Sequence, residues 1–261
     1  MSALEGNVVL VTGASKGMGR HFVRALADAG ARVAALARRS PELESLAEPE
    51  RVLAIACDAS DPRAVEAAIA AAVRQFGRLD AVVANAAIYR PFAFETASDS
   101  DIRDHVELNI LGVAWLIRAA IPHLRESQGQ IVAISSESVR MPFPMLATYA
   151  ATKAAVETLC QGLRDELRGD AIRVTVLRSG SVKGGSGGAS WSPEATEAFF
   201  KKIVATGHAA MSGEAASPES MAAALLAVLG LPHDIGVDLI EVRAAQEGMP
   251  ERARAAADLR S

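Results

Sequence analysis

The sequence predicts an α/β protein with a single-domain, Rossmann-like, doubly wound parallel sheet of about seven strands and helices on both faces. Three observations predict this fold. Short apolar runs alternate along the chain with longer runs of helical period. The short runs are almost continuously apolar, as is typical of parallel strands covered on both faces. The chain has 261 residues, half of them hydrophobic, which suffices for one domain with a sizeable core, and we find no linker to a second domain.

The elements follow in order. The expected strands are Asn7–Thr12, Arg32–Ala37, Arg51–Cys57, Ala81–Ala84, Gln130–Ser135, Arg173–Leu177 and Val237–Val242. The expected helices are Gly17–Ala29, Pro41–Ala47, Asp61–Phe76, Asp101–Glu126, Tyr149–Arg168, Pro193–Thr206 and Pro218–Leu229. Three helices begin with an N-cap residue and a first-turn proline, at Asp61-Pro62, Ser192-Pro193 and Ser217-Pro218. Such alternation favours right-handed crossovers between parallel strands.

Composition excludes several classes of partner. With 27 basic and 31 acidic residues the net charge is −4, so the chain has no general attraction to nucleic acid or to an anionic membrane. No apolar run reaches the roughly 18 residues of a transmembrane helix, and the N-terminus lacks the features of a signal peptide, so a cytoplasmic location is expected. Cys57 and Cys160 lie in apolar stretches, which favours buried thiols over a redox role. No metal site is predicted.

A glycine-rich turn follows the first strand. The segment consists of Gly13, Ala14, Ser15, Lys16, Gly17, Met18 and Gly19, and a helix comes directly after it. Glycines allow the backbone to approach a pyrophosphate, and a helix N-terminus offers free N–H groups and a positive dipole end. Three glycines could also form a plain turn. The position between the first strand and a helix favours a dinucleotide site.

The end of the second strand bears on the choice of dinucleotide. An acidic residue there would bind the ribose hydroxyls of NAD, but the strand ends in Arg38 and Arg39. Arg38 could grip a 2′-phosphate through a charge-assisted pair of hydrogen bonds, and Lys16 could reach the same phosphate. The alternative is two solvated arginines. We expect NADP(H) rather than NAD(H).

Candidate catalytic residues cluster later in the chain. Tyr149 and Lys153 are four residues apart on one helix face, where the ammonium, together with an oxidised nicotinamide, would lower the phenol pKa. Such a phenol can exchange a proton with a carbonyl oxygen. Ser136, or its neighbour Ser135, could orient that oxygen, but strand alternation allows only one to face the site. Asn109 lies in an otherwise apolar helix and could be a core amide.

Together these motifs resemble the classical short-chain dehydrogenase/reductase family over nearly the whole chain. The matching segments are TGASKGMG, CDASD, ANAA, ELNILG, ISS and YAATK. The resemblance implies a catalytic tetrad of Asn109, Ser136, Tyr149 and Lys153. It assigns Tyr149 as general acid/base and Ser136 to the carbonyl. Lys153 would bind the ribose and lower the Tyr149 pKa, and Asn109 would support a chain of waters.

The resemblance also implies the cofactor contacts. Asp58 would receive the adenine amino group with Ala59 beside it, Asn85 and Ala86 would line the trough, and Val182 would contact the carboxamide. Other positions depart from the family pattern, because Ala87 and Ser179 replace the usual glycine and proline, and Gly184 replaces a threonine. Gly180 keeps the glycine of the Pro-Gly pair. Ser181 or Ser186 could supply the hydrogen bond that the threonine would make.

Residues around the site suggest the substrate. The Gly- and Ser-rich segment within 179–211 could be a plain flexible loop, but we expect a substrate lid. Ala87–Phe94, Ser138–Leu146 and the lid through Trp191 should line a mainly apolar pocket, although several of these side chains could be core packing. The pocket candidates are Tyr89, Phe92, Met141, Phe143 and Met145. Arg140 could meet an acidic substrate group, but we expect it to be solvated.

The expected activity is that of an NADP(H)-dependent oxidoreductase acting on a small-molecule ketone, aldehyde or secondary alcohol. The resemblance implies a homodimer or homotetramer paired through the helices expected at Asp101–Glu126 and Tyr149–Arg168. Two alternatives stay open. One is a nucleotide-binding regulator that lost turnover, and the other is a lyase or epimerase that uses the same bound cofactor.

Overall fold

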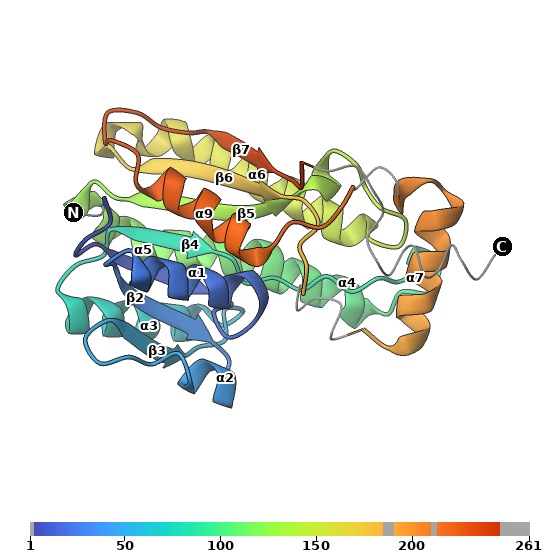
Figure 1. The fold of residues 1–261 in the computed structure, drawn as a ribbon, viewed down its shortest axis with the longest axis horizontal. Coiled ribbons are helices and arrows are strands. Elements are labelled where there is room, and N and C mark those ends of the chain that lie inside the picture. The colour runs from blue at the N-terminus through green and yellow to red at the C-terminus, as the bar shows by residue number, and fades with distance from the viewer. Residues whose placement is uncertain (1–2, 185–190, 210–212, 246–261) are drawn as a thin grey trace.

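The computed structural model describes residues 3–184, 191–209 and 213–245, which form one sheet flanked by helices (Figure 1). Seven parallel strands lie in the order β3-β2-β1-β4-β5-β6-β7. The strands are β1 Val8–Thr12, β2 Arg32–Ala37, β3 Val52–Ala56, β4 Ala81–Ala84, β5 Gln130–Ser136, β6 Arg173–Ser179 and β7 Leu239–Val242. In the register, Val9 lies between Val33 of β2 and Ala81 of β4. The predicted fold class is confirmed.

Helices connect the strands. They are α1 Gly17–Asp28, α2 Pro41–Glu44, α3 Pro62–Phe76, α4 Asp99–Val106, α5 Val113–Ser127, α6 Ala147–Leu167, α7 Pro193–Ala205 and α9 Pro218–Leu229. Shorter helical turns are η1 Phe94–Thr96, the π-helical η2 Glu107–Gly112, η3 Glu137–Val139 and η4 Arg168–Asp170. The three predicted N-caps that precede a first-turn proline are confirmed, because the side chains of Asp61, Ser192 and Ser217 each accept a backbone N–H. None of the helices in the described part of the chain is long and apolar enough to span a membrane.

Three helix boundaries differ by two residues or more from the sequence prediction. The helix expected at Asp101–Glu126 begins two residues earlier, because Ser98 and Asp101 form a reciprocal capping box, and it is widened in the middle by η2. The helix that carries Tyr149 begins at Ala147, so Tyr149 lies inside its first turn rather than at its start. The helix expected to reach Ala47 ends at Glu44, since Ser45 already serves as its C-cap.

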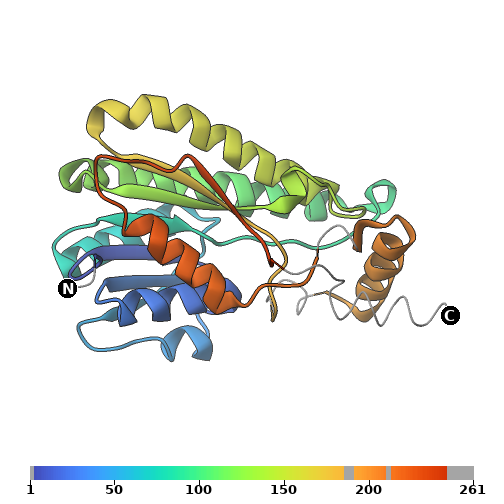
Figure 2. The ribbon, with the colours of Figure 1, turned by 45° about the horizontal axis from the view of Figure 1, so that its top comes forward.

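Two apolar cores cover the two faces of the sheet. One core joins the sheet to α3, α5 and α6, and the other joins it to α1 and α9. Figure 2 shows α1 and α9 side by side across their face, whereas α7 stands beyond the carboxyl ends of the strands. Cys57 and Cys160 are buried in the first core, where loss of solvent raises the pKa of each thiol to about 11. The expectation of buried thiols is confirmed.

Candidate active site

The glycine turn is fastened to the end of β4. Asn85 Nδ2 donates to the backbone oxygens of Thr12, over 2.8 Å, and of Gly13, over 3.3 Å. The backbone N–H groups of Asn85 and Ala86 each donate to Thr12 Oγ1 over 3.0 Å. The side chain of Asn85 therefore holds the turn in place, which is a structural task beside the cofactor contact predicted for it.

Several glycines of the turn are required by its shape. Gly13 and Gly17 have φ values of 65° and 50°, in the left-handed region that favours glycine. A Cβ on Gly13 would lie 2.9 Å from Ala86 Cα, and a Cβ on Gly19 would collide with the backbone oxygen of Gly13. The turn is thus packed tightly against the residues that follow β4.

In the described part of the chain, α1 begins without a side-chain capping bond. Its N-cap residue, Lys16, makes no side-chain capping bond, and no acidic residue lies in the first turn. By contrast, side chains accept a backbone N–H at the start of α2, α3, α4, α7 and α9. The first amides of α1, which follow Ser15 and include Met18, therefore fit an anionic group such as a pyrophosphate.

At the ends of β2 and β3, charged side chains face one another. Asp58 accepts from the backbone N–H and the hydroxyl of Ser60, over 2.9 and 2.6 Å, and these bonds, together with the charge of Arg38, lower the pKa of its carboxyl. Arg38 and Lys16 are exposed. Arg39 lies 3.7 Å from Glu44 in an exposed ion pair. Arg38 and Lys16, the predicted 2′-phosphate contacts, are therefore exposed cations. Arg39 is exposed as well, but it lies in an ion pair.

The backbone of Ala59, next to Asp58, approaches η2 closely. A Cβ on Gly112 would lie 2.7 Å from the backbone oxygen of Ala59. The glycine of the ELNILG segment thus lets the turn after β3 pack against the helix that carries Asn109.

The two serines that end β5 point to different partners. The side chain of Ser136 lies beside the Tyr149 phenol and lowers its pKa, and its Oγ accepts the N–H of Ser138 over 3.2 Å. The hydroxyl of Ser135 donates instead to Glu157 Oε1 over 2.6 Å. Of the two alternatives that the sequence left open, Ser136 is the one beside the phenol.

Lys153 is buried next to the same phenol. Its side chain is 2% exposed, its Nζ donates to the backbone oxygen of Ile134 over 2.8 Å, and Nζ lies 5.8 Å from the ring centroid of Tyr149. Burial lowers the pKa of this ammonium to about 8. Lys153 thus lies near its phenol as the spacing of four residues predicts.

The pKa of Tyr149 in the protein without cofactor is governed mainly by burial. Burial raises it above its usual value, and the nearby Tyr89 and Glu137 act in the same direction, whereas the side chain of Ser136 lowers it. The side chains of this chain alone therefore favour the protonated phenol. Lys153 does not by itself produce the lowered pKa that we expected from it together with an oxidised nicotinamide.

Asn109 has all of its side-chain hydrogen-bonding groups occupied. Its Oδ1 accepts from the N–H of Ile88 over 2.9 Å, and its Nδ2 donates to the oxygen of Ile88 over 2.9 Å and to Thr152 Oγ1 over 3.1 Å. Thr152 Oγ1 in turn donates to the backbone oxygen of Tyr149 over 2.7 Å. The amide is buried, and it links the loop after β4 to the catalytic helix rather than facing the phenol directly.

The residues after β6 complete the edge where a nicotinamide would lie. The N–H of Gly180 donates to the oxygen of Val242 over 2.8 Å, and a Cβ on Gly180 would lie 2.8 Å from Arg243 Cγ. Val182 forms an isolated parallel bridge with Ala216. Gly184 has a φ of 63°, which suits the glycine found where the family has threonine.

The remaining departures are accommodated locally. Ser179, in the place of the usual proline, donates from its hydroxyl to the oxygen of Gly180 over 2.8 Å. Ala87 is exposed, so its additional methyl group points away from the core. Ser186 and the stretches 185–190 and 210–211 of the expected lid lie outside the described residues.

Aromatic side chains form a wall over the phenol. The ring centroids of Tyr89 and Tyr149 are 5.4 Å apart, and those of Tyr89 and Trp191 are 5.0 Å apart. Trp191 Nε1 donates to the backbone oxygen of Tyr89 over 2.7 Å. Met141 and Met145 belong to the same apolar cluster. We call the side chains of Tyr89, Trp191, Met141 and Met145 the aromatic wall.

Other pocket candidates are packing residues. The ring of Phe92 lies 5.6 Å from that of His105, and Phe143 is 9% exposed within the cluster. Arg140 is 56% exposed and lies 3.4 Å from Glu241, in agreement with the expectation that it is solvated. For Phe143 the core-packing alternative therefore holds, whereas Phe92 is half-buried against His105.

Sequence reasoning missed three residues that shape the site. Thr12 and Thr152 accept the hydrogen bonds described above, and Glu137 is a buried carboxylate directly after Ser136. Glu137 carried a usable signal, because a charged residue at the end of an apolar strand, next to a catalytic candidate, is unusual in a buried position.

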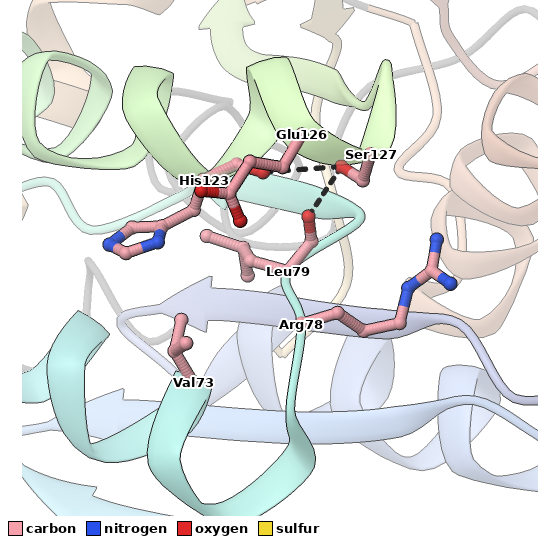
Figure 3. Close-up of a pocket in the computed structure, with 6 residues that line it drawn as sticks. All are labelled: Val73, Arg78, Leu79, His123, Glu126 and Ser127. Carbon is pink, nitrogen blue, oxygen red and sulfur yellow. Dashed lines mark hydrogen bonds between the residues drawn. The ribbon is translucent and has the colours of Figure 1, made fainter.

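A separate cavity of about 230 Å³ lies at the opposite edge of the sheet, where β4 and β5 begin (Figure 3). It is lined by Val73, Arg78, Leu79, His123, Glu126 and Ser127. Ser127 Oγ donates to the oxygen of Leu79 over 2.6 Å and closes one side of it. Because ligands of such sheets bind at the carboxyl ends of the strands, this cavity is not part of the candidate active site.

Comparisons with known proteins agree with this arrangement. A family model described as short chain dehydrogenase matches residues 7–194. The 11-beta-hydroxysteroid dehydrogenase-like 3 of Arabidopsis thaliana is 38% identical over 182 residues, which cover 67% of this chain and 59% of the relative. An uncharacterized oxidoreductase of Methylorubrum extorquens is 37% identical over 188 residues, or 70% of this chain and 75% of the relative. The chain thus spans less than two thirds of the first relative.

Solved structures share the fold over nearly the whole chain. An alcohol dehydrogenase from Thermococcus sibiricus complexed with 5-hydroxy-NADP aligns with a TM-score of 0.78 at 27% identity, over 93% of this chain and 98% of that one. A 3-ketoacyl-(acyl-carrier-protein) reductase from Brucella melitensis complexed with NADH aligns with a TM-score of 0.78 at 30% identity, over 92% and 97%. With a matching family model over most of its length, the chain belongs to the short-chain dehydrogenase/reductase family of oxidoreductases.

Proposed function

We propose that this chain is an NADP(H)-dependent oxidoreductase that interconverts a carbonyl compound and its secondary alcohol, with Tyr149 as general acid/base. One observation carries the proposal: Tyr149, Ser136 and Lys153 converge where β5 ends, at the same sheet edge as the uncapped glycine turn. A proton donor, a hydroxyl that orients an oxygen and a cation are the groups that carbonyl reduction requires.

The chain's own residues divide the work. The hydroxyls of Ser136 and Tyr149 bind the substrate oxygen and fix its orientation. Tyr149 donates its proton to that oxygen in reduction and accepts one in oxidation. The Lys153 ammonium stabilises the phenolate left behind, and Asn109 holds the helix through Thr152. A bound nicotinamide supplies or accepts the hydride.

The residues present fit such a cofactor. The uncapped amides of α1 would bind its pyrophosphate, Asp58 and Ala59 its adenine, and Lys153 its ribose. Asn85 and Ala86 would line its trough, with Gly180 and Val182 near the carboxamide. Arg38 and Lys16 are exposed cations beside the adenosine end, and Arg39 is held by Glu44, so Arg38 is the stronger 2′-phosphate ligand. The Thermococcus structure holds an NADP derivative and the Brucella structure NADH, so only the local charges favour NADP(H) here.

The aromatic wall supports an apolar substrate of moderate size. Aromatic and methionine side chains beside the reacting phenol contribute large apolar area and adapt to flat ring systems. The relative named 11-beta-hydroxysteroid dehydrogenase-like 3 refers in its name to steroids, which are fused ring systems of that shape. We therefore propose cyclic or aryl ketones and the corresponding alcohols.

For the assembly we propose a homodimer or homotetramer and a cytoplasmic location. Val106 and Leu111, on α4 and η2, are 37% and 38% exposed. Apolar side chains on this helical surface fit a contact with a second copy. Light scattering after size exclusion measures the assembly, and a monomer at micromolar concentration contradicts it.

A spectrophotometric panel of ketones, aldehydes and alcohols with NADPH or NADP⁺ tests the activity. We expect cyclic or aryl ketones to consume NADPH and Tyr149→Phe to abolish this consumption. Glu157→Gln is the matched control, because Glu157 lies on the same helix but contacts Ser135 and Arg178 instead of the phenol.

Two outcomes would replace the proposal. Tight NADPH binding without turnover on any member of the panel favours a regulatory protein. Conversion of a substrate without net change in NADPH favours a lyase or epimerase. NADPH binding is measured for the wild type and for Tyr149→Phe. Equal binding shows that the variant is folded and has lost only the chemical step.

A further inference from the structure

The segment after β4 brings Tyr89 against two other rings of the site. The ring centroid of Tyr89 lies 5.4 Å from that of Tyr149 and 5.0 Å from that of Trp191. The residue before Tyr89 is firmly held, because the Asn109 side chain binds both the N–H and the oxygen of Ile88 over 2.9 Å each. The place of the Tyr89 ring then depends on how the chain is held on its other side.

Arg90, the next residue, is attached to α4 at two points. Its N–H donates to His105 Nε2 over 3.2 Å, and its Nη2 donates to Asp104 Oδ2 over 2.6 Å. The guanidinium and the Asp104 carboxylate are 36% and 47% exposed, and ion pairs of this kind contribute little. His105 is fully buried, so water cannot replace the N–H of Arg90 at Nε2. The imidazole is therefore the stronger of the two attachments.

The two partners of His105 fix its tautomer. Nδ1 lies 2.6 Å from the backbone oxygen of Asp101, which can only accept a hydrogen bond, so Nδ1 carries the proton. Nε2 of the neutral ring is then an acceptor, which is what the N–H of Arg90 requires. The ring of Phe92 packs edge-on against the imidazole at 5.6 Å. A neutral imidazole thus joins α4 to the segment that carries Tyr89.

We propose that His105 is a positioning residue for substrate binding, because it holds Arg90 and thereby sets the place of the Tyr89 ring against which an apolar ketone binds. The inference rests on the proposed function and adds a residue outside the aromatic wall that selects between substrates. His105 acts only through residues 88–90. When Arg90 is released, Tyr89 moves and a ring-shaped substrate loses contact area, while the groups that carry out the chemical step stay in place.

Substitutions of His105 separate the roles of its two nitrogens. A glutamine reaches the position of Nε2 and keeps an acceptor for Arg90, whereas an asparagine reaches only that of Nδ1. We expect His105→Asn to raise KM for a cyclic or aryl ketone about fivefold, as the loss of one hydrogen bond implies. The kcat values and the KM for a short polar ketone should stay at the wild-type level, and His105→Gln should restore the KM for the cyclic ketone.

Asp104→Asn is the matched control. It removes the ion pair with Arg90 and leaves the bond to His105, so KM for the cyclic ketone should not change. A rise in Asp104→Asn or in His105→Gln equal to that in His105→Asn overturns the inference. So does an equal rise in KM for both ketones, because His105 would then support the site as a whole.

A second measurement does not depend on turnover. The chain has two tryptophans, so Trp115→Phe leaves Trp191 as the only fluorescent indole. Trp191 Nε1 donates to the Tyr89 oxygen over 2.7 Å, so its emission reports movement of Tyr89. In this background we expect His105→Asn to shift the emission to longer wavelength and His105→Gln to leave it in place. The same emission with all three side chains at position 105 overturns the inference.

Acidification makes the same change without a substitution, and this test remains if His105→Asn does not fold. A proton on Nε2 turns it into a donor that opposes the N–H of Arg90. The charged groups that act on the ring are Arg90 and, from α4, Asp101 and Asp104. Burial lowers the pKa of His105, so the emission should shift reversibly below about pH 6.5 and should not shift in His105→Gln.

An equal response of both proteins to pH overturns the inference. Absence of turnover on every carbonyl, with the emission shifts present, counts against the proposed function alone.

Discussion

Ser135 donates its hydroxyl to the Glu157 carboxylate over 2.6 Å, whereas the side chain of its neighbour Ser136 lies beside the phenol of Tyr149, on the same helix. These two serines therefore serve different purposes. Ser135 belongs to a half-buried ionic network in which Arg178 donates to both Glu157 and Glu241. Ser136 belongs to the site.

The serine pair gives a matched test of catalysis. If Ser136 binds the substrate oxygen as proposed, Ser136→Ala should lower kcat/KM about 100-fold, as for other donors to a developing oxyanion. Ser135→Ala should leave kcat/KM near the wild-type value and cost about 1 kcal/mol of unfolding free energy. Steady-state kinetics and denaturant titration check both. Equal kinetic losses in the two variants would contradict the assignment of Ser136.

Asn109 gives a test of the link between the loop and the catalytic helix. Asn109→Ala leaves the N–H and oxygen of Ile88 and one bond of Thr152 without their partner. Buried groups left in this way cost about 1–3 kcal/mol each, so we expect a loss of at least about 2 kcal/mol in unfolding free energy. Thr152→Val, which disturbs one of these bonds, should cost less. Equal losses would show that Asn109 acts through Thr152 alone.

How much of the fold and of the site could be predicted from the sequence depends on how far apart along the chain the interacting residues lie. The strands and the glycine turn follow from local patterns, since continuous apolar runs and glycine spacing are properties of neighbouring residues. The partners of Asn109 could not be predicted, because Ile88 and Thr152 are 21 and 43 positions away. The π-helical turn η2, which carries Asn109, has no local signal that we recognised.

The Tyr149 pKa shows a second limit. Spacing predicts that Lys153 lies one turn from the phenol, but the effect of burial depends on everything packed around it. Tyr89 and Glu137 reach the phenol from other elements, and only the fold brings them there. Proximity within a helix was therefore predictable, whereas the contributions of burial, Tyr89 and Glu137 to the pKa were not.

His105 predicts a pH dependence of stability. It is fully buried, its Nδ1 lies 2.6 Å from the oxygen of Asp101, and its Nε2 accepts from the N–H of Arg90 over 3.2 Å. Burial lowers its pKa, and the charge of Arg90 acts in the same direction despite Asp101 and Asp104. Protonation would turn the Nε2 acceptor into a donor and oppose the bond from Arg90.

The direction in which stability changes with pH follows from proton binding to His105. The folded protein resists the proton that the unfolded chain binds near its usual pKa of about 6.5, so stability is full above that pH and falls as the pH drops below it. Denaturant unfolding between about pH 8 and pH 5 should show this loss in the wild type and less of it in His105→Gln. His233→Gln, at an exposed position, should retain the wild-type slope.

The arginine pair after β2 tests the choice of cofactor. If Arg38 binds the 2′-phosphate as proposed, Arg38→Asp replaces a charge-assisted bond with repulsion, so we expect NADPH to bind about 100-fold more weakly, with a smaller effect on NADH. Arg39→Asp should weaken NADPH less, because Arg39 already pairs with Glu44. Fluorescence titration with both cofactors measures the ratio. Equal weakening of NADPH and NADH by Arg38→Asp would contradict the phosphate assignment.

Trp191 tests the aromatic wall in two steps. Trp191→Phe keeps an aromatic ring against Tyr89 and Phe199 but loses the 2.7 Å bond from Nε1 to the Tyr89 oxygen. Trp191→Ala loses both the bond and the ring. If the wall binds apolar substrates, KM for a cyclic or aryl ketone should rise modestly in the first variant and about tenfold or more in the second, since a buried aromatic side chain contributes several kcal/mol of packing.

A short polar ketone is the control. Its KM should change little, because such a small substrate would not reach the wall. A parallel rise in KM for both ketones would instead mean that Trp191 supports the site through Tyr89 and does not bind substrate.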